Sequence, residues 1–176
     1  MGNLAALLLR LVLGGLLAGH GAQKLFGSFS GPGIAGTSGF MEMLGLTPGK
    51  PWALLAGLSE FGGGVLTALG FLTPLGPIGA IGAMTMATTT AHKGKPVWVT
   101  EGGAELPVTN IAAATALILN GPGKWSLDRA LGLRLPRWLA PLGLVMVILT
   151  VIYAGSGNDE SARDEAREGA AGDEEA

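Results

Sequence analysis

The chain has 176 residues, of which 48 % are hydrophobic and 14 % are charged, and none is cysteine. Soluble domains carry about a quarter charged residues, so this composition excludes an ordinary water-soluble domain, and the lack of cysteine excludes disulfides, thiol chemistry, zinc ribbons and cysteine-ligated clusters. The net charge of −2 gives no support to a nucleic-acid partner. The charge is unevenly distributed, with a basic body and an acidic end: eight of the 13 acidic residues lie between Asp159 and Glu175.

Five apolar blocks predict five helices that span a membrane. They cover residues 4–26, 52–71, 75–91, 106–119 and 138–153. A helix needs about 20 apolar residues to cross the hydrocarbon core, with roughly 17 as the lower limit. The first three blocks reach that limit, and the last two can still span if the bilayer thins locally or flanking side chains snorkel. We therefore expect an all-α protein of the cell membrane with several spans.

The first block is predicted to remain as a spanning helix. A cleaved signal peptide carries its basic residues before the apolar run, whereas Arg10 lies inside it. The stretch Ala18-Gly19-His20 is also a poor cleavage site.

The connections between the blocks differ in length and charge. Thr73-Pro74 predicts a tight turn, whereas residues 27–51 are long and contain a predicted short amphipathic helix at residues 36–44. Residues 124–137 are basic, which favours an N-terminus in the cytoplasm and an acidic tail outside. The tryptophans lie beside predicted helix ends, as expected of an aromatic belt: Trp52, Trp98, Trp125 and Trp138.

Small residues four positions apart predict close helix packing, because they let two backbones approach. The pairs are Gly15 and Gly19, Ser59 and Gly63, and Gly79 and Ala83. Their occurrence on three successive blocks favours a tight bundle.

Titratable residues lie in one half of the predicted membrane domain. Because successive spans alternate in direction, the end of the first block, the start of the second, the end of the third and the start of the fourth share a face. Ionisable side chains at membrane depth usually face a bundle interior or a cavity. We therefore predict a polar intramembrane site formed by six residues: His20, Gln23, Lys24, Glu60, His92 and Glu105.

Each of these residues also has a simpler structural interpretation. Glu60 can form an ion pair with Lys24 or Lys50, and His20 can belong to a polar cap at the end of its helix. The stripe of Thr85, Thr88 and Thr89 directs His92 towards the site, but threonine hydroxyls also bond to their own helix backbone. Glu105 is favourable at a helix N-terminus because of the dipole alone.

A metal site is not predicted. Two histidines and two glutamates suit a hard or borderline cation, but they lack a tight local spacing such as H-E-x-x-H.

Four segments carry a family resemblance. They are His20-Gly21-Ala22-Gln23-Lys24-Leu25-Phe26-Gly27, Ala56-Gly57-Leu58-Ser59-Glu60-Phe61-Gly62-Gly63, the threonine-rich helix that ends at His92, and Gly102-Gly103-Ala104-Glu105-Leu106-Pro107. Over residues 4–131 the chain resembles the DoxX family of small membrane proteins. The resemblance implies an integral membrane four-helix bundle for residues 1–131. Residues 132–155 then add a further transmembrane helix, and residues 156–176 an acidic tail that we expect to be disordered because it cannot bury enough apolar surface.

Three functions remain open at this stage. The resemblance implies redox work, since the family takes its name from a thiosulfate:quinone oxidoreductase subunit and members are associated with oxidative-stress complexes that contain partner enzymes. The first hypothesis is therefore a subunit of a membrane redox complex whose polar site binds a quinone headgroup or relays protons, since His and carboxyl groups can supply the accompanying proton. The second is a non-catalytic membrane anchor for soluble enzymes. The third is a small-molecule or lipid transporter, which the lack of an evident inverted repeat disfavours.

Overall fold

The structure is a computed structural model that describes the backbone of residues 2–174 and the side chains of residues 2–156. The described chain is helical and contains no β-strand. Its α-helices are α1 (Asn3–Phe26), α2 (Gly33–Met43), α3 (Gly49–Leu69), α4 (Leu75–Thr89), α5 (Glu105–Asn120), α6 (Leu127–Ala130) and α7 (Leu139–Glu174). All five apolar blocks thus form helices, and the short helix expected at residues 36–44 is α2.

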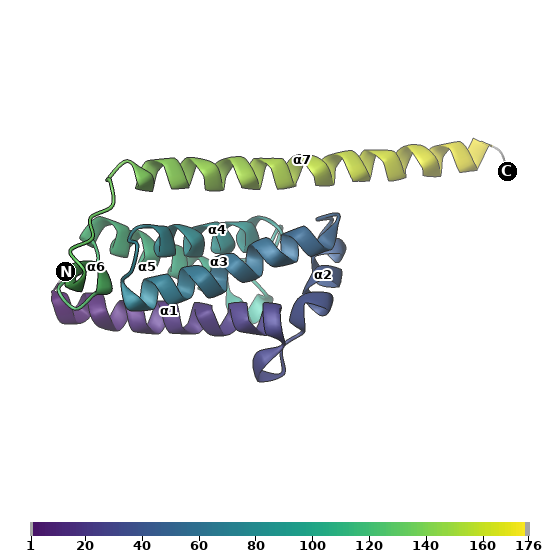
Figure 1. Ribbon diagram of the computed structural model, residues 1–176. Helices are drawn as coiled ribbons and strands as arrows, with labels where there is room; N and C mark the ends of the chain where they lie inside the picture. The colour runs from purple at the N-terminus through teal and green to yellow at the C-terminus, as the bar shows by residue number, and fades with distance from the viewer. Residues whose placement is uncertain (1, 175–176) are drawn as a thin grey trace.

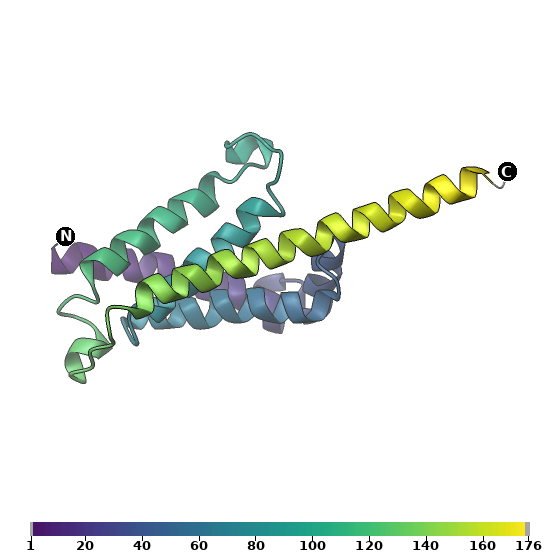
Figure 2. The same cartoon turned by 90° about the horizontal axis from the view of Figure 1, so that it is seen from above.

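Four helices form the bundle. α1 packs on α3, α3 on α4 and α4 on α5. Neighbouring helices in this series run in opposite directions (Figures 1 and 2). α2 and the connection between α4 and α5 lie at one end, which we call the α2 end. The N-terminus, the α3–α4 turn and α6 lie at the opposite end, which we call the α6 end. The predicted four-helix bundle and the shared face of the two larger connections are confirmed.

Within the part of the chain that the structure describes, three helices are long and apolar enough to cross a membrane. They are α1, α3 and the segment Leu139–Ser156 of α7. α4 and α5 have 15 and 16 residues, and at 1.5 Å per residue they measure about 23–24 Å, less than the hydrocarbon core of about 30 Å. These spans define a multi-pass membrane protein, in which α4 and α5 are packed against longer neighbours.

The tryptophans mark both ends of the bundle. Trp52 lies in the first turn of α3 and Trp98 in the α4–α5 connection, both at the α2 end. Trp125 and Trp138 lie just before α6 and α7, at the α6 end. Such a distribution is typical of the two membrane–water interfaces.

Backbone contact between α1 and α3 depends on glycine. A Cβ atom added to Gly14 would lie 2.5 Å from the carbonyl oxygen of Gly64, and one added to Gly64 would lie 2.6 Å from the carbonyl oxygen of Gly14. The predicted contact residues Gly15 and Gly19 are wrong, because nothing lies within 4 Å of a Cβ at either position. The packed face is instead that of Gly14 and Ala18, one residue earlier. The sequence alone does not separate the two faces, because Gly14 and Ala18 have the same spacing of four as Gly15 and Gly19.

The α3–α4 contact agrees with the prediction. A Cβ added to Gly79 would lie 3.1 Å from the carbonyl oxygen of Ser59 and 3.5 Å from the Cα of Gly63. The small residues of these two helices therefore face each other as expected from their spacing.

α6 is docked on the turn between α3 and α4 by a buried carboxylate. Asp128 accepts hydrogen bonds from the backbone N–H groups of Leu72, at 2.7 Å, and Thr73, at 2.9 Å, and its own N–H donates to the carbonyl oxygen of Gly70 at 3.1 Å. The buried Arg10 of α1 donates to the carbonyl oxygen of Trp125 in the same region. The α6 end is thus closed by polar contacts that sequence periodicity did not indicate.

α7 lies along α4 and continues past the α2 end of the bundle (Figures 1 and 2). The sequence predicts a disordered tail from residue 156. In the structure α7 instead continues as a helix to Glu174. Alanine, glutamate and arginine are good helix formers, and extending an existing helix avoids the cost of nucleation. The expected tail also includes residues 175 and 176, which lie outside the described residues.

Candidate functional site

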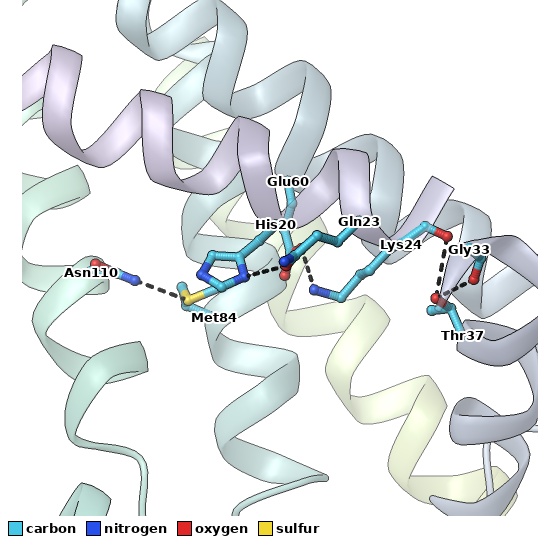
Figure 3. A network of polar contacts seen from close by, with 8 residues as sticks. All are labelled: His20, Gln23, Lys24, Gly33, Thr37, Glu60, Met84 and Asn110. Atoms are coloured by element: carbon cyan, nitrogen blue, oxygen red, sulfur yellow. Dashed lines mark hydrogen bonds and ion pairs between the residues drawn. The ribbon is translucent and has the colours of Figure 1, made fainter. Parts of the chain in front are cut away.

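A partly buried ion pair joins the last turn of α1 to the middle of α3. Glu60 of α3 is only 6 % exposed, and its Oε2 accepts a hydrogen bond from Nζ of Lys24 in α1 (Figure 3). Burying an uncompensated carboxylate is costly, so Lys24 offsets that cost. Of the two partners expected for Glu60, the structure selects Lys24.

Close packing of the helices places this pair. Gly21 lies directly against the backbone of Phe61, and Gly57 lies against the side chain of Leu25. Larger residues at these two positions would hold the helices apart. The end of α1 is held by α2, because Oγ1 of the buried Thr37 lies 3.2 Å from the carbonyl oxygen of Lys24 (Figure 3).

A cavity of about 800 Å³, partly open to the outside of the bundle, lies beside the ion pair. Its walls come mainly from α2, α3, α4 and α7, with contributions from the end of α1 and the α4–α5 connection, and they are mostly apolar. The charged and titratable residues that line it are Lys24, Glu60, His92 and Lys95. Glu60 lies 11 residues from the start of α3, which is about 16 Å of helix, whereas His92 lies just beyond the end of α4. The cavity therefore carries polar groups at two different depths.

The cavity brings together three of the six predicted site residues: Lys24, Glu60 and His92. His20 and Gln23 do not line it. Nδ1 of His20 donates to Oε1 of Gln23 at 3.2 Å, in a polar cap at the end of α1 (Figure 3). Because His20 is exposed, this contact agrees with the simpler interpretation of that residue.

Glu105 does not line the cavity either. It stands in the first turn of α5 and accepts a hydrogen bond from the backbone N–H of Val99 at 3.0 Å. His92, which does line it, donates from Nδ1 to the carbonyl oxygen of Gly102 at 2.6 Å. Both residues therefore also order the α4–α5 connection, a role that the sequence did not predict for His92.

The threonine stripe has a structural explanation. The hydroxyl of Thr88 donates to the carbonyl oxygen of Met84 at 2.8 Å, and that of Thr89 lies 3.0 Å from the carbonyl oxygen of Thr85. These bonds satisfy the hydroxyls within α4, as threonine commonly does in helices. In the part of the chain whose side chains are described, no group of three or more His, Asp or Glu is arranged to hold a metal ion.

Sequence reasoning missed the contribution of α7 to the cavity. Gly143, Val147 and Thr150 line it, and the next residue in this series, Ala154, is buried against α2 and α3. The spacing of 4, 3 and 4 residues places all four on one helix face. Large apolar residues occupy the intervening exposed positions, so a periodicity analysis of this block could have indicated the packed face.

A bundle of spanning helices defines a small integral membrane protein, and in this one the pair of Lys24 and the buried Glu60 lies beside a largely apolar cavity. The family model for DoxX matches residues 5–93, and the chain belongs to the DoxX family. The matched segment runs from α1 to the end of α4 and includes Lys24, Glu60 and His92, but it stops short of residue 131, the limit expected from the sequence. No curated protein and no solved structure matches the chain.

Proposed function

We propose that this protein is a subunit of a membrane redox complex and that its cavity binds the headgroup of a quinone. The observation that supports the proposal most is the pair of Lys24 and the buried Glu60, which faces a largely apolar cavity between membrane-spanning helices. Ligand pockets are typically apolar concavities of about 300–1,000 Å³ with a few polar groups that orient the ligand, and this cavity has those properties.

The residue types suit quinone chemistry. An ammonium group has three N–H donors, and one of those on Lys24 bonds to Glu60, so another can donate to a quinone carbonyl oxygen. Reduction of a quinone to a quinol consumes two electrons and two protons. Under the proposal a soluble partner enzyme supplies the electrons, while the ammonium of Lys24, held by Glu60, and a protonated His92 each give one proton to the quinone.

A quinone assay of the purified protein tests the proposal. The full chain is extracted in a mild detergent, and organic extracts are analysed for quinone per mole of protein. We expect quinone to be retained by the wild type and by Glu101→Gln, which alters an exposed acid in the α4–α5 connection, and to be lost from Glu60→Gln. A wild-type protein that neither retains quinone nor binds added quinone would refute the proposal.

The second candidate is a non-catalytic anchor that gathers soluble enzymes. The feature that favours it is the extension of α7, whose acidic half continues to Glu174 beyond the α2 end (Figure 1). An anchor would lose its partner enzymes when residues 157–176 are removed, and its Glu60→Gln variant would keep them. Co-purification of partners with these two variants therefore separates the two functions.

A further inference from the structure

A smaller pocket, of about 270 Å³, lies at the α6 end of the bundle. It is lined by Asn3 of α1, by Pro122, Gly123 and Lys124 of the loop after α5, and by Arg129 of α6. The backbone N–H of Lys124 donates to Oδ1 of Asn3 at 3.0 Å, which fixes this loop to the start of α1. The pocket is therefore built by segments that are distant in the sequence and joined by a hydrogen bond.

The groups that this pocket presents to a ligand are hydrogen-bond donors. Oδ1 of Asn3 is occupied by the N–H of Lys124, so the amide of Asn3 offers its N–H groups. The ammonium of Lys124 and the guanidinium of Arg129 have donors and no acceptor. The carbonyl oxygen of Gly123 already accepts from Oγ of Ser126 at 2.8 Å, and no carboxylate of the described side chains lines the pocket. The pocket thus suits a ligand with acceptor oxygens and negative charge.

The positive charge at this end is not neutralised within the described part of the molecule. Four exposed basic residues lie between α5 and α7: Lys124, Arg129, Arg134 and Arg137. Among the side chains that the structure describes, the only ion pair is Lys24–Glu60, so none of the four is paired with a carboxylate. Asp128 lies among them, but it is buried and bonded to backbone N–H groups of the α3–α4 turn. Uncompensated positive charge of this kind attracts anions.

The pocket lies at the level of the lipid headgroups. Asn3 is the first residue of the spanning helix α1, and the next residue, Leu4, is an exposed apolar side chain. Trp125 directly follows Lys124 and is exposed, and exposed tryptophans of membrane proteins lie where the hydrocarbon core meets the headgroups. The anions that are most abundant at that level are lipid phosphates, and their acyl chains would face the exposed apolar surface of α1.

We propose that the pocket between Asn3, Lys124 and Arg129 binds the headgroup of an anionic phospholipid. The phosphate oxygens accept charge-assisted hydrogen bonds from Lys124 and Arg129, and the amide of Asn3 donates to a further headgroup oxygen. The site is independent of the proposed quinone function, since none of its residues lines the larger cavity.

Native mass spectrometry of the full chain in detergent tests the site. The protein is titrated with dioleoylphosphatidylglycerol and with dioleoylphosphatidylcholine, which has the same acyl chains and phosphate but no net charge. A basic residue near a lipid surface contributes about a fivefold gain in binding to anionic lipid, so the two basic residues of the pocket predict about 25-fold tighter binding of phosphatidylglycerol. We expect this lipid to stay bound when inorganic phosphate is added in about tenfold excess, because its acyl chains also contribute to binding.

Two double variants with the same change in charge locate the bound lipid. Lys124→Gln/Arg129→Gln alters the pocket and should abolish the preference for phosphatidylglycerol. Arg134→Gln/Arg137→Gln removes equal charge at exposed positions that do not line the pocket, and it should keep most of the preference. Thermal midpoints verify that both variants fold, and Arg129→Gln with its control Arg134→Gln repeats the comparison if the first double variant does not.

Four outcomes would overturn the proposal. Equal affinity of the wild type for the two lipids would show that net charge does not select the ligand, and an equal loss of preference in the two double variants would show diffuse attraction without a site. Displacement of the lipid by inorganic phosphate would identify a site for a free anion. Absence of phosphatidylglycerol binding would leave the basic residues to another partner, such as an acidic protein.

Discussion

Exchange of single glycines for alanine tests the close contact between α1 and α3. Gly64→Ala adds a methyl group at a position 2.6 Å from the carbonyl oxygen of Gly14, and the crowded atoms belong to backbone that cannot rotate away. Gly62→Ala is the matched control on the same helix, because nothing lies within 4 Å of a Cβ at that position.

The magnitude follows from the difference between the two variants. Both gain the same helix propensity, about 1 kcal/mol for alanine over glycine, so this contribution cancels. Overpacking costs about 1–3 kcal/mol, and the rigidity of backbone places Gly64→Ala in the upper part of that range. At about 2–4 °C per kcal/mol for a chain of this size, we expect Gly64→Ala to melt roughly 4–12 °C below Gly62→Ala.

Thermal unfolding in detergent, followed by tryptophan fluorescence, measures this difference. Gly14→Ala and Gly15→Ala repeat the comparison on α1, where a Cβ is crowded at the first position and free of neighbours at the second. Equal midpoints within each pair would refute the packing argument. A lower midpoint for Gly15→Ala than for Gly14→Ala would restore the helix face that the sequence predicted.

Three further predictions test other parts of the molecule. Asp128→Ala removes the acceptor of two buried backbone N–H groups and should cost about 2–4 kcal/mol; an unchanged thermal midpoint would contradict the docking of α6 on the α3–α4 turn. Lys24→Met leaves the carboxylate of Glu60 without its partner and should cost about 3–5 kcal/mol, most of which the double variant Lys24→Met/Glu60→Leu should recover. Strict additivity of these two changes would show that the pair does not interact. Removal of residues 157–176 should leave the thermal midpoint unchanged, because the described contacts of α7 with the bundle lie between Gly143 and Ala154; a lower midpoint would assign the acidic segment a structural role.

The helices themselves were readable from the sequence because run length and hydropathy are local properties. Packing faces were only partly readable: Ser59, Gly63 and Gly79 were correct, whereas Gly14 was missed because adjacent glycines satisfy the same spacing rule. A choice of register depends on which face meets the neighbouring helix, and that is a property of the whole bundle.

The polar residues show a similar division. The partner of Glu60 was one of two lysines named from the sequence, since charge and helix depth limit the choices. The contacts of His92 and Glu105 could not be foreseen, because their partners are backbone groups of a loop whose path is set by tertiary structure. The docking of α7 on α4 was likewise missed, although Gly143, Val147, Thr150 and Ala154 follow a helical period.

Photoaffinity labelling with an azido-substituted long-chain quinone tests the central claim most directly, because it reports where the ligand lies. The full chain is labelled in detergent and the modified peptides are mapped by mass spectrometry. Binding in the cavity predicts labels on α3 around Glu60 and on α7 around Val147, both suppressed by excess unlabelled decyl quinone and reduced in Glu60→Gln. Labels spread over exposed apolar positions such as Leu8 and Leu16 of α1, without competition by unlabelled quinone, would contradict the claim.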